Sequence, residues 1–189
     1  MRPIPSRVLG VALLGAFALH AASKDAAHLQ EMLWLCHVAT VLMALGLLAG
    51  WHRVVAAGFL LHVGFGTASW VLDILAHHDT TASSVLVHLL PLAVGAIEVR
   101  RKGWPSGVVL PAWLFYSAWV VLCRWVTDPA LNVNLSHAAW GPLARVMGGV
   151  WISWAFNAAA MLAGFSIANV ALRRLTARSR GLAVDSARG

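Results

Sequence analysis

Residues 33–53 read LWLCHVATVLMALGLLAGWHR, a long apolar run that ends at a glycine, a tryptophan and two basic side chains. A membrane-spanning helix needs roughly 20 mainly apolar residues. The run therefore predicts a transmembrane helix over about residues 30–50. His52 and Arg53 place the end of this helix at a membrane surface, because basic side chains remain in water or among lipid head groups.

Five further apolar runs lie on either side of this one. They predict spans over about residues 7–22, 54–76, 82–99, 105–127 and 146–172. With 60% hydrophobic and 11% charged residues, the 189-residue chain holds more apolar side chains than a soluble domain of this size can bury. We therefore expect an all-α, six-helix transmembrane bundle that forms a single domain over residues 1–189.

Positive charge lies in every second connection between these runs. Arginine or lysine residues precede the first run, and others follow the second, the fourth and the sixth. Because basic connections stay on the cytoplasmic side, we expect both termini in the cytoplasm and a multi-pass protein of the bacterial inner membrane. The net charge of +7 is divided among short groups and forms no stripe. It therefore predicts contacts with membrane lipids and no nucleic-acid partner.

The first run has an alternative interpretation as a cleaved signal peptide. It follows two arginines and ends in Ala21-Ala22-Ser23, which are small residues of the kind found at cleavage sites. Cleavage would leave five spans and a new N-terminus outside the cell. The six-span interpretation keeps the run as a helix.

A thiol and an imidazole lie at similar depths in two of the predicted spans. Counted from the outer ends of their helices at 1.5 Å per residue, Cys36 and His88 both lie roughly 9 Å below the surface. Such a pair can perform nucleophilic catalysis, because the imidazole removes the thiol proton and the thiolate attacks an acyl carbonyl. Asp73, near the outer end of the third span, is the candidate to orient the imidazole.

The only long connection runs from Thr127 to Arg145 and is expected on the outer side. It is too apolar for a solvated linker, which predicts a lid that packs over the helix ends. Its polar side chains are candidates to contact a substrate or to donate hydrogen bonds to an oxyanion. These candidates are Asn132, Asn134 and His137.

Three short motifs carry a resemblance to known membrane proteins. Leu33-Trp34-Leu35-Cys36, Val87-His88-Leu89 and Asn132-Val133-Asn134 resemble motifs of the YwaF-type bacterial integral membrane proteins and of the related eukaryotic Cys/His transmembrane acyltransferases. Residues 88–129 are also similar to the androgen-induced membrane hydrolases. The resemblance implies acyl transfer or hydrolysis on a lipid beneath the outer leaflet, with Cys36 as nucleophile and His88 as base. The chain lacks the proline and histidine that often precede the cysteine in the YwaF-type pattern.

Two non-enzymatic interpretations remain open beside this leading hypothesis, which needs no cofactor. His37 lies at nearly the depth of His88, so the two imidazoles are candidates for the axial ligands of a b-type haem in an electron carrier. Cys36 and His37 point about 100° apart on one helix, so they are not expected to face His88 together. The other alternative is a structural or accessory subunit without chemistry.

The remaining histidines predict no metal site. They scatter near the outer face without the i, i+4 spacing of metal ligands, so we expect solvated side chains at His20, His28, His77, His78 and His137, with Asp79 among them. His62 is placed roughly 10 Å deeper and would need an unwound helix to join the Cys36 site, so we expect it to bond a neighbouring backbone or hydroxyl group. Cys123 lies near the depth of Cys36, so a disulfide between them is an open possibility.

Overall fold

The computed structural model describes residues 4–77, 80–139 and 141–186, and within them it contains helices and no strand. The longer helices are α1 (Ser6–Ala22), α2 (Leu35–Ala49), α3 (His52–Leu61), α4 (Thr67–His77), α5 (Ala82–Lys102), α6 (Val109–Val126) and α8 (Val150–Ser186). The shorter segments are the 3-10 turns η1 (Leu29–Leu33) and η3 (Val133–Leu135), the π-helical segment η2 (His62–Gly66) and the single turn α7 (Gly141–Ala144).

Among the described residues, four helical segments are long and apolar enough to cross a membrane. They are His52–Leu75, Ala82–Lys102, Val109–Val126 and Val150–Ala177. Helices α1 and α2 are apolar but shorter, with 17 and 15 residues. The chain therefore has the helices of a multi-pass membrane protein, and the all-α fold is confirmed. Six crossings and the sides of the two termini stay predictions.

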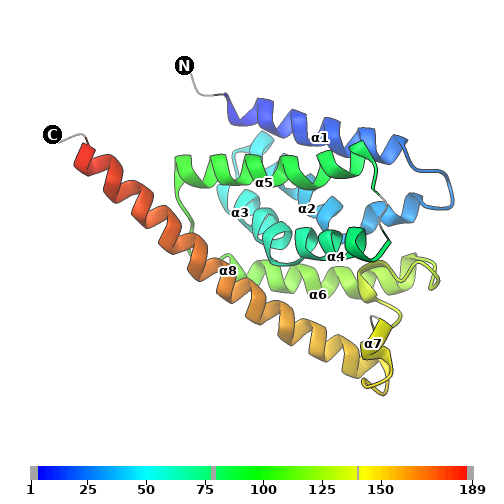
Figure 1. The fold of residues 1–189 in the computed structure, drawn as a ribbon. Coiled ribbons are helices and arrows are strands. Elements are labelled where there is room, and N and C mark those ends of the chain that lie inside the picture. The colour runs from blue at the N-terminus through cyan, green and yellow to red at the C-terminus, as the bar shows by residue number, and fades with distance from the viewer. Residues whose placement is uncertain (1–3, 78–79, 140, 187–189) are drawn as a thin grey trace.

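Helix α2 lies between two neighbours at the centre of the bundle. It packs mainly against α1 and α3, and α1 also packs against α5. In Figure 1, α1 and α5 run side by side along one side of the bundle, with α6 along the other. Two glycines permit close approach: a Cβ at Gly46 would lie 2.8 Å from Val55, and one at Gly64 would lie 2.6 Å from Phe165 of α8. Small residues have this role in membrane bundles.

A buried carboxylate joins the beginning of α1 to the end of α5. The Glu98 side chain is fully buried, accepts a hydrogen bond of 2.8 Å from the Ser6 hydroxyl and lies 2.9 Å from the Lys102 ammonium. Helix α5 continues three residues beyond its predicted end, through Arg100, Arg101 and Lys102. Basic side chains stabilise the last turn of a helix, where the backbone carbonyls carry partial negative charge.

Helix α6 begins at Val109, four residues after the predicted start at Pro105. Gly103 and Gly107 adopt φ angles of 82° and 73°, in the left-handed region that favours glycine. The connection between α5 and α6 therefore stays non-helical past Pro105. The ring of His52 donates a hydrogen bond of 2.8 Å from Nε2 to the carbonyl of Gly103, which fixes this connection to the start of α3.

Helix α8 is longer than its predicted span of 146–172, since it runs from Val150 to Ser186. Its C-terminal part extends beyond the other helices in Figure 1.

At the other end of the bundle, the connection from Thr127 to Arg145 packs back as a lid, with Val133 and Asn134 almost fully buried. The predicted lid is therefore confirmed.

Candidate functional site

The second predicted span is interrupted, and this interruption positions the site. Trp34 adopts φ −56° and ψ 141°, which separates the 3-10 turn η1 from α2. Cys36 and His37 consequently lie in the first turn of α2. The backbone and Cβ of Cys36 pack on Gly66, where an added Cβ would lie 2.9 Å from the Cβ of Cys36. Only a glycine at position 66 fits against Cys36 without a shift.

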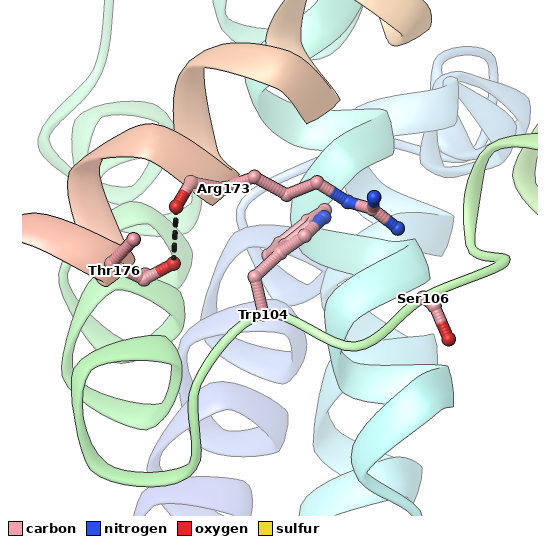
Figure 2. Close-up of a pocket in the computed structure, with 5 residues that line it drawn as sticks. Trp104, Ser106, Arg173 and Thr176 are labelled. Atoms are coloured by element: carbon pink, nitrogen blue, oxygen red, sulfur yellow. Dashed lines mark hydrogen bonds between the residues drawn. The ribbon is translucent and has the colours of Figure 1, made fainter. Parts of the chain in front are cut away.

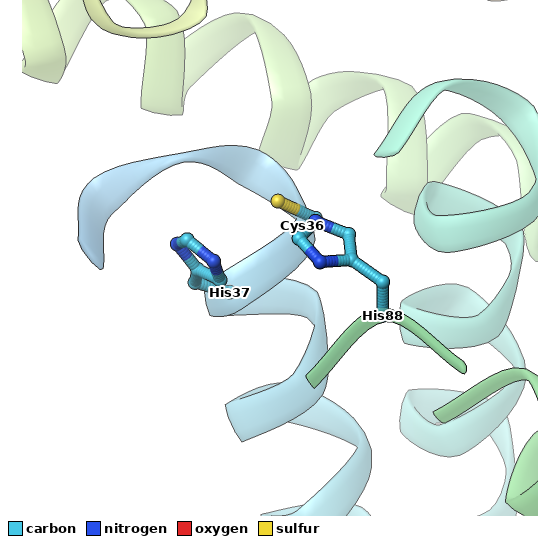
Figure 3. Close-up of side chains that lie close together, drawn as sticks. All are labelled: Cys36, His37 and His88. Atoms are coloured by element: carbon cyan, nitrogen blue, oxygen red, sulfur yellow. The ribbon is translucent and has the colours of Figure 1, made fainter. Parts of the chain in front are cut away.

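Cys36, His37 and His88 converge in the interior of the protein (Figure 3). One ligand atom from each of these three buried side chains lies within 4.8 Å of the other two. The expectation that Cys36 and His37 do not face His88 together is therefore wrong. Cys36 and His37 point about 100° apart on α2, and each still has a ligand atom within 4.8 Å of one on His88 of α5.

Both imidazoles of this group have one nitrogen committed to a backbone carbonyl. His37 Nδ1 lies 2.9 Å from the carbonyl oxygen of Glu31, and His88 Nδ1 lies 2.8 Å from that of Ser84. Because a carbonyl oxygen only accepts, each Nδ1 carries the proton and each Nε2 keeps a free lone pair. The Nε2 atom of His37 is buried and has no hydrogen-bond partner among the described residues.

Trp70 of α4 fixes the His88 ring from one side. The two rings are stacked, with centroids 4.5 Å apart and an angle of 7° between their planes. The indole Nε1–H of Trp70 donates a hydrogen bond of 3.0 Å to the Ser84 hydroxyl. Ser84 lies in the first turn of α5, whose N-cap Thr81 accepts a hydrogen bond from the Ser84 backbone N–H.

Two further histidines lie close to this group, contrary to expectation. His20 is 3% exposed, and its ring centroid lies 4.9 Å from that of His37. His62 is fully buried, with its ring centroid 6.4 Å from that of His88. The solvated position expected for His20 and the separate depth expected for His62 are therefore wrong. His62 begins the π-helical segment η2, which supplies the departure from regular helix that its approach requires.

The hydroxyl of Thr40 links His62 to the cysteine backbone. It donates a hydrogen bond of 2.9 Å to the carbonyl of Cys36 and lies 2.9 Å from Nε2 of His62. Since the hydroxyl proton points to Cys36, His62 Nε2–H is the donor to Thr40, and the expected bond from His62 to a hydroxyl group is confirmed.

His28 is exposed beside Asp25, as expected of a solvated histidine. The side chains of His77, His78 and Asp79 lie outside the described residues.

A cavity of about 460 Å³ adjoins Cys36, His37 and His88. Charged and polar groups lie around it, including the Lys24–Glu31 ion pair, His20, Ser69 and Ser84. Its apolar lining comes from α4, from η2 and from the lid, at Phe65, Leu72, Leu131, Leu135 and Leu143. The cavity thus connects a buried thiol and imidazole with an apolar compartment.

Two further predicted site residues lie at the cavity and in the lid. Asp73, the candidate to orient the imidazole, is exposed and lines the same cavity as His88, whose Nδ1 bonds the Ser84 carbonyl. Asn134 is buried and bonds the backbone of Leu33 and Leu35, at 2.9 Å and 2.8 Å. It therefore anchors the lid to the start of α2.

The other two lid residues also make structural hydrogen bonds. The Asn132 side-chain oxygen accepts from the backbone N–H groups of His137 and Ala138, at 2.9 Å and 3.0 Å. The His137 ring lies 3.4 Å from the Thr127 hydroxyl. These contacts stabilise the lid itself.

Cys36 and Cys123 are both free, buried thiols, so the possible disulfide is not formed.

His37 and His88, the two candidate axial ligands of a haem, lie side by side in the interior. Their rings meet edge to face with centroids 5.5 Å apart. The Cys36 sulfur lies within 4.8 Å of a ligand atom of each ring. The donor set of one thiol and two imidazoles suits a single small metal ion.

Sequence reasoning missed the residues that orient the site. No pattern in the sequence distinguishes Trp70, Ser84 or Thr40 as a residue of the site. Comparisons with protein-family models, with curated proteins and with solved structures give no match for this chain.

Proposed function

We propose that this protein binds one copper ion within the membrane through Cys36, His37 and His88. The observation that carries the proposal is the convergence of three buried ligand atoms within 4.8 Å of one another. Both imidazoles have Nδ1 bonded to a backbone carbonyl, which is the arrangement that orients histidine ligands in metal sites. Burying the Nε2 atom of His37 without a hydrogen-bond partner costs free energy, and a bound metal ion would accept its lone pair.

The donor types favour a soft first-row metal. A thiolate with two imidazoles suits copper and zinc, and a trigonal set of two histidines and one cysteine is typical of copper sites. The three ligands include no carboxylate, the ligand that magnesium, calcium and manganese prefer. Bound copper would supply one-electron redox chemistry. The Cys36 thiol must lose its proton on binding, and the resulting thiolate is stabilised in this buried position by the cation.

The neighbouring residues hold the ligands in place. Trp70 and Ser84 fix the ring plane of His88, and the Glu31 carbonyl fixes that of His37. Thr40 bonds the Cys36 carbonyl and connects it to His62. The cavity beside the site, with Glu31 and His20 in its lining, is the route by which an ion would reach the three ligands.

Copper binding is tested on the full-length protein in detergent or nanodiscs, by elemental analysis and by competition with a chromophoric Cu(I) chelator. We expect one copper ion per chain. Cys36→Ser, His37→Ala and His88→Ala should each weaken binding by roughly tenfold or more, since each removes one of three ligands. Cys123→Ser is the matched control, because Cys123 is also a buried free thiol but lies outside the group. Equal copper binding by all four variants would contradict the proposal. If the purified protein instead retains zinc, and the three ligand variants lose that zinc while Cys123→Ser keeps it, zinc would replace copper as the metal.

The cavity supports a second candidate function, acyl transfer or hydrolysis on a membrane lipid at the outer leaflet of the bacterial inner membrane. Its apolar lining can receive an acyl chain beside Cys36. His88 Nε2 would accept the thiol proton, and the sulfur would form a bond to the acyl carbon. The ester C–O bond would then break, and the proton on His88 would pass to the leaving alkoxide. Water or a second alcohol would release the acyl group from the thioester.

His37 distinguishes the two functions. Copper binding requires its Nε2, whereas acyl transfer requires only Cys36 and His88. For acyl transfer, Cys36→Ala and His88→Ala should abolish turnover of a fluorescent phospholipid, and chloroacetamide should label Cys36. His37→Ala should keep that turnover and lose copper. Turnover that persists in Cys36→Ala would exclude the acyl-transfer candidate.

A further inference from the structure

A second cavity, of about 450 Å³, lies at the end of the bundle where the basic residues gather. It opens between α8 and the connection from α5 to α6, and its lining includes Trp104, Ser106, Arg173 and Thr176 (Figure 2). This is the opposite end of α5 from His88, next to the basic last turn of that helix. The cavity is therefore separate from the Cys36 site.

The floor of this cavity is held rigidly. Trp104 donates a hydrogen bond of 2.7 Å from Nε1 to the side-chain oxygen of Asn169, and its ring packs edge to face on Phe59. The His52 bond to Gly103 fixes the backbone immediately before Trp104. A ligand that enters here meets a surface that is already ordered, which lowers the entropic cost of binding.

The free donors in this cavity suit an anion. The Arg173 side chain runs from α8 across Trp104 in Figure 2, and its guanidinium makes no ion pair with any described residue. Ser106, on the connection from α5 to α6, also lines the cavity. The Thr176 hydroxyl proton is used within the helix, on the carbonyls of Leu172 and Arg173, so the Arg173 guanidinium supplies the free donors.

We propose that this cavity binds the phosphate group of an anionic membrane phospholipid. Guanidinium groups bind phosphate with two parallel hydrogen bonds, and basic pockets between membrane helices bind lipid head groups. Two apolar side chains of α8, Ile167 and Val170, are 71% and 47% exposed within two turns of Arg173. They offer a surface along which the acyl chains of the same lipid can lie. This surface favours a lipid over a soluble phosphate.

The test measures lipid retention by native mass spectrometry and affinity by thermal shift, with phosphatidylglycerol, phosphatidylcholine and inorganic phosphate as probes. We expect one retained phosphatidylglycerol and weak binding of phosphatidylcholine. Arg173→Gln should lower the affinity by roughly tenfold, the effect of losing a charge-assisted bidentate contact. Arg173→Lys should retain part of it, because the charge remains and the paired geometry is lost.

Arg174→Gln is the matched control, since it removes the same charge from the next residue of α8, which does not line the cavity. An equal loss in Arg173→Gln and Arg174→Gln would show a diffuse charge effect and overturn the site. Binding of inorganic phosphate that depends on Arg173, without retention of phosphatidylglycerol, would overturn the lipid as its source. Copper binding should be the same in all of these variants, so this result is independent of the Cys36 site.

Discussion

The indole ring of Trp70 lies parallel to the imidazole ring of His88, and both rings are hydrogen-bonded to the same residue, Ser84. The serine hydroxyl accepts from Trp70 and the serine carbonyl accepts from His88. One residue at the start of α5 thus fixes a ring on α4 and a ring on its own helix. The orientation of His88 is set before any ligand arrives.

Replacing Trp70 should weaken metal binding without removing a ligand. Trp70→Ala deletes both the stack and the bond to Ser84, so we expect copper affinity to fall by roughly tenfold, as for other groups that orient metal ligands. Trp70→Phe keeps a stacked ring and should lie between this variant and the wild type. Chelator competition measures the effect. Trp151→Ala, at a tryptophan that is 70% exposed, should match the wild type, and an equal loss there would show a general effect of losing a tryptophan.

Adding one methyl group at Gly66 should displace Cys36. In Gly66→Ala the new Cβ would lie 2.9 Å from the Cβ of Cys36 and 3.2 Å from its Cα, so α2 or η2 must shift. We expect lower copper affinity and a lower Tm. Gly15→Ala is the control, because a Cβ there meets nothing within 4 Å and alanine favours a helix. A Gly66→Ala protein with unchanged copper affinity would contradict the close contact.

Asn134 should contribute to stability and not to copper binding. Its side chain bonds the backbone of Leu33 and Leu35 from a residue with φ 56°. Asn134→Gly removes the amide and tolerates this φ, so we expect a loss of about 1–3 kcal/mol of unfolding free energy from the hydrogen bonds, together with the smaller cost of a more flexible unfolded chain. Thermal unfolding measures it. Asn132→Gly, at φ 43° and bonded only within the lid, should cost less.

The predicted orientation is open to a labelling test. Both native cysteines are buried, so single surface cysteines at Ser106 and Asp128 can be labelled selectively. If basic connections lie in the cytoplasm, a membrane-impermeant maleimide added to intact cells should label Asp128→Cys and spare Ser106→Cys. The reverse pattern would invert the bundle and place the copper site near the cytoplasmic face.

The helices were predictable because their signal is local. Apolar runs of the required length, ended by Gly50 or by Arg100 to Lys102, mark helices by composition alone. The boundaries were less accurate where backbone conformation decided them. Gly103 and Gly107 delay α6 beyond Pro105, and Trp34 divides the second span into two segments.

The site was only partly predictable because depth along a straight helix is a poor guide to proximity. Counting residues paired Cys36 with His88, which the structure brings together. The same counting placed His62 too deep to join the Cys36 site, because it assumed a regular α-helical rise per residue through residues 62–66. The buried surroundings of His20 depend on how α1 packs against α2 and α5, and no local pattern in the sequence reports that packing.

The π-helical turn from His62 to Gly66 acts as a phase shift between the two halves of one helix. A π turn holds one residue more than a regular turn, so every side chain after it is rotated by about 100° relative to an uninterrupted α-helix. His62 lies at the beginning of this turn and Trp70 lies beyond it, and the rings of both lie against His88, with centroids 6.4 Å and 4.5 Å from that of His88. Regular α-helical winding of the same sequence through residues 62–66 would turn Trp70 away from the site. His88 would then keep its place on α5 and lose the stacked ring that aligns it.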